Sequence, residues 1–254
     1  MVFLLLLLSL ALHSIFCNPE PNNPRARIVG GHDAPSGKYP YMASLRQDGV
    51  HVCGGSVISN RFILTAAHCV VLLAPNETNV ALGSNFLNQT EDYHEVKRII
   101  TSNFDADKII NDIALLELKT IIRYNENIQP ISLSTKENST GGYSATLTGW
   151  GLMSEDDKDV PNTLQEIGLT IEEPKVCATE YKTPIMDSHI CTHTELNKGG
   201  CRRDSGSPLV SNGLQIGILS YGKDCGVASP MVYTRVSFYK SWVDRILNAS
   251  MIFN

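Results

Sequence analysis

The sequence predicts an all-β fold, a β-sandwich or β-barrel, that ends in one α-helix. From residue 28 onward, short apolar segments of strand-like composition alternate with Gly, Pro, Asn and Asp residues that indicate turns. Strands at such short intervals are typical of sandwiches and barrels. A helical pattern occurs only near the end of the chain, in segment 235–250, where apolar residues recur at steps of three and four: Val236, Tyr239, Trp242, Val243, Ile246 and Leu247.

The composition of the 254-residue chain is that of an ordinary globular protein, with 43% hydrophobic and 19% charged residues. That apolar share is enough for a sizeable core, and the length allows one or two domains. The formal net charge is −5, and no basic stripe is present. Because nucleic-acid binding needs clustered cations for the phosphates, no nucleic-acid partner is expected.

The N-terminal residues differ from the rest of the chain. Residues 1–17 form an apolar run, too short to span a bilayer comfortably, which we interpret as a cleaved secretory signal peptide. A membrane anchor is the alternative. No later segment is apolar enough to cross a membrane, so we expect an extracellular product without a membrane partner. Residues 18–27 hold three prolines and three asparagines, which indicates an extended propeptide, and the change to "IVGG" indicates processing between Arg27 and Ile28.

The cysteine count points to disulfides. Of seven cysteines, Cys17 would leave with the signal peptide, and an even number in a secreted chain favours disulfides over thiols. No CxxC pair is present to favour zinc. Four N-glycosylation sequons predict that several surface asparagines carry glycans. The six mature cysteines are Cys53, Cys69, Cys177, Cys191, Cys201 and Cys225, and the sequons are at Asn76, Asn88, Asn138 and Asn248.

Three motifs carry residues suited to nucleophilic chemistry. "TAAHC" holds His68, "NDIAL" holds Asp112 and "CRRDSGSP" holds Ser205. A serine hydroxyl is a weak nucleophile at neutral pH, so an imidazole must take its proton, and an anion must orient that imidazole. Taken singly, each residue also has an ordinary structural explanation. The same holds for the other histidines, which are expected to be surface or satisfied core residues: His51, His94, His189 and His193.

Taken together, the motifs "IVGG", "TAAHC", "DIAL", "GW", "DSGSP" and "SYG" over residues 28–247 resemble those of the trypsin/chymotrypsin type of serine protease, made as a secreted zymogen. The resemblance implies two six-stranded antiparallel β-barrels with the site in the cleft between them. The first barrel would supply His68 and Asp112, and the second Ser205. The implied organisation is a signal peptide (1–17), an activation propeptide (18–27) and a peptidase domain (28–254), divided into the first barrel (28–128), the second barrel (129–234) and the C-terminal helix and tail (235–254).

The resemblance also implies the disulfides and the route of activation. Cleavage before Ile28 would free an α-amine that pairs with Asp204, because a buried charge needs a partner of opposite sign. No cysteine lies in residues 18–27, so the propeptide should be lost. The expected partners are peptide or protein substrates, an activating trypsin-like protease and proteinaceous inhibitors, and the expected state is a monomer. The implied disulfides are Cys53–Cys69, Cys177–Cys191 and Cys201–Cys225.

Arg203 departs from the family pattern, where glycine is usual. The resemblance implies an oxyanion hole made by the backbone N–H groups of Arg203 and Ser205, and an arginine keeps that N–H. If the backbone there needs a positive φ, a non-glycine residue costs about 1 kcal/mol. We expect an active enzyme whose Arg203 side chain points toward the leaving group, hinders bulky inhibitors and favours acidic residues after the cleaved bond. The alternative is a side chain in solvent without effect. Ser207 replaces a second glycine and should be tolerated.

The predicted specificity pocket lacks the aspartate of trypsin-like enzymes. Gly199, followed by Gly200, stands at its floor, so this chain should not cut its own Arg27–Ile28 bond. Gly222 leaves the entrance open, and Met231 would fill part of the pocket. The pocket is therefore expected to accept Leu, Met, Tyr or Phe, with an elastase-like preference for Ala or Val as the alternative. Substrate should pair with the backbone from Ser220 to Gly222, next to the aromatic face of Tyr221.

Two other classes of function compete with the protease. Arg203, Ser207 and Met231 would fit a binding module that kept the fold and lost turnover. A structural glycoprotein is the third hypothesis, which a complete triad disfavours. No metal or other cofactor is expected, because Ser84 stands where calcium-binding relatives carry a carboxylate.

Overall fold

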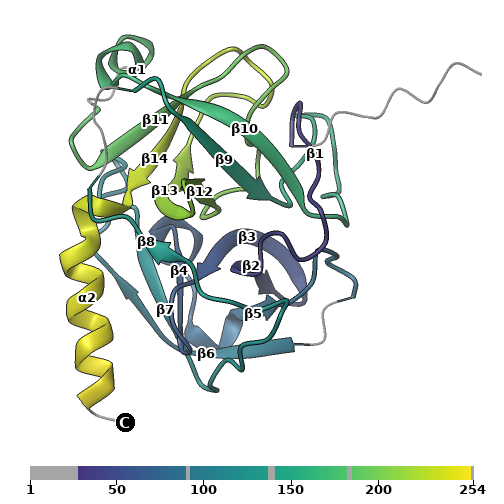
Figure 1. Cartoon of the computed structure of the whole chain (residues 1–254), viewed down its shortest axis with the longest axis vertical. Helices are drawn as coiled ribbons and strands as arrows, with labels where there is room; N and C mark the ends of the chain where they lie inside the picture. Colours follow the sequence, from purple (N-terminus) through teal and green to yellow (C-terminus); the bar gives the residue numbers. More distant parts are fainter. Residues whose placement is uncertain (1–27, 90–91, 137–140, 182–184, 253–254) are drawn as a thin grey trace, which may run out of the picture.

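The computed structural model describes residues 28–89, 92–136, 141–181 and 185–252. Two β-barrels lie one against the other, and the C-terminal helix runs along one side of the first (Figure 1). The expected pair of six-stranded antiparallel barrels with a C-terminal helix is confirmed. The predicted signal peptide and propeptide, with Cys17 and Arg27, and the sequon at Asn138 lie outside the described residues.

The first barrel closes in the strand order β2-β3-β4-β7-β6-β5. The β2–β3 hairpin turns at Asp48 and Gly49, both with positive φ (49° and 79°), which suits the Asp-Gly pair to a tight turn. Apolar side chains from all six strands fill the interior, among them Leu45, Val80 and Leu116. The strands are β2 (Met42–Gln47), β3 (Val50–Val57), β4 (Phe62–Thr65), β5 (Asn79–Leu82), β6 (Asp92–Thr101) and β7 (Ala114–Leu118).

The second barrel is a ring in the order β9-β10-β11-β14-β13-β12, closed because β9 pairs with both β10 and β12. The β12–β13 hairpin turns at Asn212 and Gly213, again both with positive φ. Short strands β1 (His32–Asp33) and β8 (Ser132–Leu133) add to β10 and β13. The ring strands are β9 (Ser144–Gly149), β10 (Gln165–Glu172), β11 (His189–His193), β12 (Pro208–Ser211), β13 (Leu214–Tyr221) and β14 (Met231–Arg235).

Helix α2 (Val236–Ile252) follows the second barrel and packs against both barrels. Its buried residues Val236, Tyr239 and Val243 contact a cluster that includes Phe62 and Leu115 of the first barrel. The helix therefore joins the two barrels. The other helical segments are short: α1 (Pro174–Glu180), η1 (Ala67–Cys69) and η2 (Pro75–Glu77). Within the described residues, no helix combines the length and apolar character that a membrane crossing requires.

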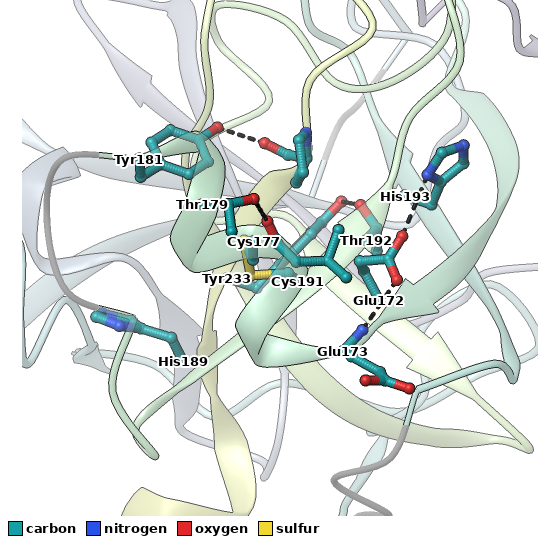
Figure 2. Close-up of a disulfide and its surroundings, with 12 residues drawn as sticks. Glu172, Glu173, Cys177, Thr179, Tyr181, His189, Cys191, Thr192, His193 and Tyr233 are labelled. Carbon is teal, nitrogen blue, oxygen red and sulfur yellow. Dashed lines mark hydrogen bonds and ion pairs between the residues drawn. A yellow bond between two sulfur atoms is a disulfide. The ribbon is translucent and has the colours of Figure 1, made fainter.

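Three disulfides form, and their pairing is the one that the family resemblance implies. Cys53–Cys69 joins β3 to η1, and Cys201–Cys225 joins two segments of the second barrel. Cys177–Cys191 ties α1 to β11 (Figure 2). The sequon asparagines Asn76, Asn88 and Asn248 are exposed.

Candidate active site

His68 and Asp112 are in direct contact. His68 lies in the 3-10 turn η1, just beyond the end of β4, and Asp112 lies just before β7. The distance from His68 Nδ1 to Asp112 Oδ2 is 2.7 Å, and the His68 backbone N–H donates to Asp112 Oδ1 at 2.9 Å. Because a carboxylate can only accept, the imidazole carries its proton on Nδ1 and leaves Nε2 as a base. The Asp112 side chain is 1% exposed and the His68 side chain 32%, so the base reaches solvent while its partner does not.

The second barrel supplies further bonds to Asp112. Ser220 Oγ donates to Asp112 Oδ2, and Thr234 Oγ1 donates to the Asp112 carbonyl at 2.6 Å. Burial raises the pKa of the Asp112 carboxyl, but the hydrogen bonds and charge of His68, with the bond from Ser220, outweigh that effect and hold the pKa below its usual range. Asp112 is therefore ionised at neutral pH and fixed in orientation.

Ser205 is positioned by the packing of its loop on the first barrel. Its carbonyl accepts from Gly54 N at 2.8 Å, and Gly206 N donates to Leu219 O at 2.8 Å. Gly206 has a φ of 80°, and a Cβ there would lie 2.3 Å from Thr65 Oγ1, at the end of the strand that leads to His68. In the described part of the chain, Ser205 Oγ makes no hydrogen bond to His68. Such bonds are often long in unliganded enzymes.

Arg203 adopts the left-handed conformation, with a φ of 74°. It forms a reciprocal pair with His51 of β3: Arg203 Nη1 donates to the His51 carbonyl at 2.7 Å, and His51 Nε2 lies 3.1 Å from the Arg203 carbonyl. Burial lowers the pKa of His51 to about 4, so the ring is neutral, with its proton on Nε2, and Nδ1 accepts from Ser44 Oγ at 2.9 Å. These bonds offset the strain of a side chain at positive φ, and they hold the Arg203 side chain on the first barrel rather than in solvent.

Asp204 is a buried acid. It is 0% exposed and accepts from Gly151 N at 2.7 Å and Cys201 N at 3.0 Å. Burial raises its pKa to about 7, although these backbone donors act in the opposite direction. A Cβ on Gly149 or Gly151 would lie 2.2 Å from the carboxylate, which explains the glycines on both sides of the tryptophan in "GWG". Ile28, also 0% exposed, packs in the core of the same barrel.

A cavity of about 280 Å³ opens beside Ser205. Met231 forms part of its wall, and the Met231 sulfur accepts from Gly200 N at 2.9 Å. A Cβ on Gly199 would lie 2.6 Å from Thr194 Cγ2 and 3.1 Å from that sulfur, so both side chains pack against Gly199. The predicted floor residue Gly199 is not among the residues that line the cavity. The lining residues are Glu155, Gly200, Cys201, Arg202, Ser205, Leu219, Ser220, Tyr221, Gly222, Lys223, Asp224, Cys225 and Met231.

Several of these residues were missed by sequence reasoning. Leu219 adds an apolar surface, and Arg202, Lys223, Asp224 and Glu155 bring charge. Arg202 pairs with Glu155 at 3.1 Å. The sequence neighbours of Cys201 and Cys225 could have been recognised as pocket residues, because a disulfide between two pocket walls brings the residues next to it to the pocket. The two groups of potential metal ligands in the described residues each include a disulfide, whose sulfurs are not thiolates: Cys53, His68 and Cys69, and Glu155, Cys201 and Cys225.

Comparison with known proteins identifies the family. Residues 28–243 match the family model described as Trypsin. The chain belongs to the trypsin family. This trypsin-family chain is 44% identical to Chymotrypsin-2 of Vespa crabro over 219 residues, 86% of this chain and 99% of that protein. It is 33% identical to Trypsin delta of Drosophila erecta over 224 residues, 86% and 88% of the two chains.

The solved structure of neuropsin, described as a serine protease expressed in the limbic system of mouse brain, has the same trypsin-family fold. Its TM-score is 0.78 at 28% identity, over 85% of this chain and 98% of that one. The protein is therefore a trypsin-family serine protease, a hydrolase. Because similar proteins are named both chymotrypsin and trypsin, family membership leaves the preferred side chain at the cleaved bond undecided.

The buried Asp204 predicts how the stability of the uncleaved trypsin-family chain depends on pH. Its pKa rises from 3.8 to about 7 on folding, so the folded state holds the proton more tightly than the unfolded state. The free energy of unfolding should therefore fall as pH rises from about 4 to about 7, by about 4 kcal/mol in total. Asp204→Asn should remove most of this decrease, measured by urea unfolding across pH. Equal slopes in the two proteins would contradict the buried acid.

Proposed function

We propose that this chain is a secreted serine endopeptidase, made as a zymogen, that hydrolyses peptide bonds through Ser205, His68 and Asp112. The observation that carries the proposal is the 2.7 Å contact between His68 and the buried Asp112, beside a cavity that Ser205 lines. An ionised acid that orients a partly exposed imidazole is the arrangement that can activate a hydroxyl nucleophile such as Ser205.

Each residue has a distinct part in the proposed reaction. His68 Nε2 takes the proton of Ser205 Oγ as that oxygen attacks the substrate carbonyl, and Asp112 stabilises the imidazolium that forms. The backbone N–H groups of Arg203 and Ser205 donate to the developing oxyanion. His68 then gives its proton to the leaving amine, which departs with the C-terminal part of the substrate. Water next attacks the acyl-enzyme in the same way, and the acid product and free Ser205 are released.

Activation is proposed to follow cleavage of the Arg27–Ile28 bond. The new α-amine of Ile28 would pair with Asp204, which is fully buried and whose described hydrogen bonds are from backbone N–H groups only. A cation at this carboxylate would remove the cost of burying it and would order the loop that carries Arg203 and Ser205. The burial of Ile28 in the second barrel is consistent with this change.

The cavity favours a chymotrypsin-like preference over a trypsin-like one. Met231 and Leu219 contribute apolar side chains to its lining, and no carboxylate takes the place of Gly199. Glu155 and Asp224 also line the cavity, but Glu155 already pairs with Arg202. Leu, Met, Tyr and Phe are therefore the proposed side chains before the cleaved bond, and a separate trypsin-like protease is the proposed activator. Ala or Val would be preferred instead if Met231 leaves too little depth.

Secretion and glycosylation complete the proposal. Three disulfides use all six cysteines of residues 28–254, which suits an oxidising compartment. The sequon asparagines among the described residues are all exposed, so glycans on them would meet solvent: Asn76, Asn88 and Asn248.

Covalent labelling tests the nucleophile. After removal of residues 1–27 by trypsin and inhibition of the trypsin, a fluorophosphonate should add to Ser205, because the His68–Asp112 pair activates that hydroxyl. Peptide mass mapping should find the adduct on the Ser205 peptide, and Ser205→Ala should abolish it. Ser211→Ala is the matched control, since Ser211 Oγ bonds the Ser144 carbonyl in the second barrel and lies outside the site. An unlabelled wild-type chain would instead favour a binding module.

Substitution of Met231 tests the pocket. Met231→Gly removes the thioether between Gly200 and Gly222, so the ratio of kcat/KM for Phe over Leu anilides should rise about tenfold. Met231→Leu keeps the volume and should leave that ratio near the wild-type value. A Gly variant with an unaltered substrate profile, or rapid cleavage after Arg by the wild-type enzyme, would contradict this pocket.

Substitution of Arg203 tests its effect on inhibitors. Arg203→Gly removes the guanidinium that stands on β3, so a bulky protein inhibitor should bind about tenfold more tightly, or by about 1.4 kcal/mol. Arg123→Gly, which removes an exposed arginine that does not line the cavity, is the matched control for charge. Unchanged inhibitor affinity in the Arg203 variant would show that the side chain does not obstruct the site.

A further inference from the structure

The loop from Ser102 to Asn111, between β6 and β7, leads directly to Asp112 and contains strained backbone. Asn103, Ile109 and Asn111 have φ values of 51°, 50° and 57°. Asparagine tolerates this left-handed region, but a β-branched residue there is a genuine outlier. Within the loop, Asp105 and Ile110 pair through two backbone hydrogen bonds, and contacts from outside the loop add to these in holding Ile109.

His189, at the start of β11 in the second barrel, supplies such a contact. Its Nε2 lies 3.2 Å from the Ile109 carbonyl, and its Nδ1 accepts from Met186 N at 3.2 Å. Because Nδ1 accepts, the ring proton is on Nε2, which donates to Ile109. Burial lowers the pKa of His189, which keeps the ring neutral at neutral pH.

Packing and hydrogen bonding fix the His189 side chain and backbone in place. The residue is 2% exposed, and its ring packs edge-on against Tyr221, with 6.2 Å between centroids. Its carbonyl accepts from Arg235 Nη2 at 2.8 Å. Figure 2 shows His189 and His193 pointing away from each other at the two ends of β11, on either side of the Cys177–Cys191 disulfide.

Two further hydrogen bonds hold the segment between Ile109 and Asp112. Tyr239 of α2 donates from its hydroxyl to Asn111 Oδ1 at 2.8 Å, and Thr234 of β14 donates to the Asp112 carbonyl. The second barrel and the helix that follows it therefore contact residues 109, 111 and 112 of the first barrel. Among these three contacts, the one from His189 is nearest to the tip of the loop.

The tip of this loop carries a bond with the same chemistry as the proposed activation bond. The sequence has four bonds between a basic residue and isoleucine: Arg27–Ile28, Arg98–Ile99, Lys108–Ile109 and Arg245–Ile246. The second lies within strand β6 and the fourth within helix α2, where regular hydrogen bonding protects them. Lys108 is in the loop, and its side chain is 66% exposed. Exposed loop tips of this kind are preferred sites of proteolytic cleavage.

Ile28 and Ile109 both have a positive φ (31° and 50°), and both carbonyls already accept a hydrogen bond, that of Ile28 from Gly31 N. What distinguishes Lys108–Ile109 is that the bond to its isoleucine carbonyl comes from the opposite barrel. A protease binds its substrate as an extended strand through main-chain hydrogen bonds. Ile109 is left-handed, and its carbonyl already accepts from His189. Cleavage there would cut the chain three residues before Asp112. Local opening of the loop must therefore precede cleavage, and the His189 bond opposes that opening.

We propose that His189 is a positioning residue that holds the 102–111 loop closed, so that a trypsin-like activator cuts Arg27–Ile28 and spares Lys108–Ile109. The inference rests on the proposed activation and adds to it the reason that the same activator leaves the Asp112 loop intact.

The experiment compares the two cleavage rates in the precursor, with Ser205→Ala as background so that the chain's own activity is excluded. His189→Phe keeps a ring against Tyr221 and loses both nitrogens, whereas His189→Gln keeps an N–H near the position of Nε2. His193→Phe is the matched control, because His193 is on the same strand, 57% exposed, and pairs with Glu172. Intact mass spectrometry during incubation with trypsin reports each cut separately.

In His189→Phe, cleavage at Lys108–Ile109 should be at least about tenfold faster than in the parent, while cleavage at Arg27–Ile28 proceeds at the parent rate. His189→Gln should restore most of the protection, and His193→Phe should match the parent. A purely structural role would expose many basic sites together and would not be rescued by Gln. If His189→Phe fails to fold, His189→Asn, whose amide is too short to reach Ile109, should show the same selective cleavage.

Parent-like protection of Lys108–Ile109 in the folded Phe or Asn variant would overturn the proposal. That result would leave the proposed protease function untouched, because Ser205 labelling tests the function in a separate protein. Conversely, a chain that resists fluorophosphonate can still show the selective cut at Lys108.

Discussion

The arrangement of the site depends on one buried interaction, the contact between the Asp112 carboxylate and the His68 imidazole at the junction of the two barrels. A carboxylate with 1% of its side chain exposed is costly unless donors surround it. His68 supplies two of these donors and Ser220 of the second barrel a third. The acid is therefore kept ionised mainly by His68 of its own barrel, with Ser220 of the second barrel adding to this, and it orients the imidazole.

Two histidines make equivalent hydrogen bonds across the same junction between the barrels. His51 of the first barrel holds the carbonyl of Arg203 in the second, and His189 of the second barrel holds the carbonyl of Ile109 in the first. The residue whose carbonyl each histidine contacts has a left-handed backbone and is not glycine. Burial lowers the pKa of each ring. A neutral imidazole can accept at one nitrogen and donate at the other, so each ring links a strained loop to the opposite barrel without burying a charge.

Asp204 differs from Asp112 because its described donors are backbone amides alone, and its pKa is raised rather than lowered. Among the described residues, the Asp112 carboxylate therefore has side-chain donors, whereas the Asp204 carboxylate has backbone donors only. The proposed α-amine of Ile28 would give the Asp204 carboxylate a charged partner, which connects removal of the propeptide to the order of the loop that bears Arg203 and Ser205. In the pocket, the Met231 side chain packs against Gly199 and also accepts from Gly200 N.

The sequence by itself determined the strands, their tight turns and the chemical types in the site. Asp48-Gly49 and Asn212-Gly213 are local signals, because two successive positive φ values favour these residues. The period of the last helix and the motifs around His68, Asp112 and Ser205 are also local. Only the tertiary structure decided that Thr234 and Ser220 bind Asp112, that Met231 packs against Gly199, and that His51 and His189 support loops of the opposite barrel. These contacts join residues far apart in the chain, and no local pattern specifies which side chains meet once two barrels pack together.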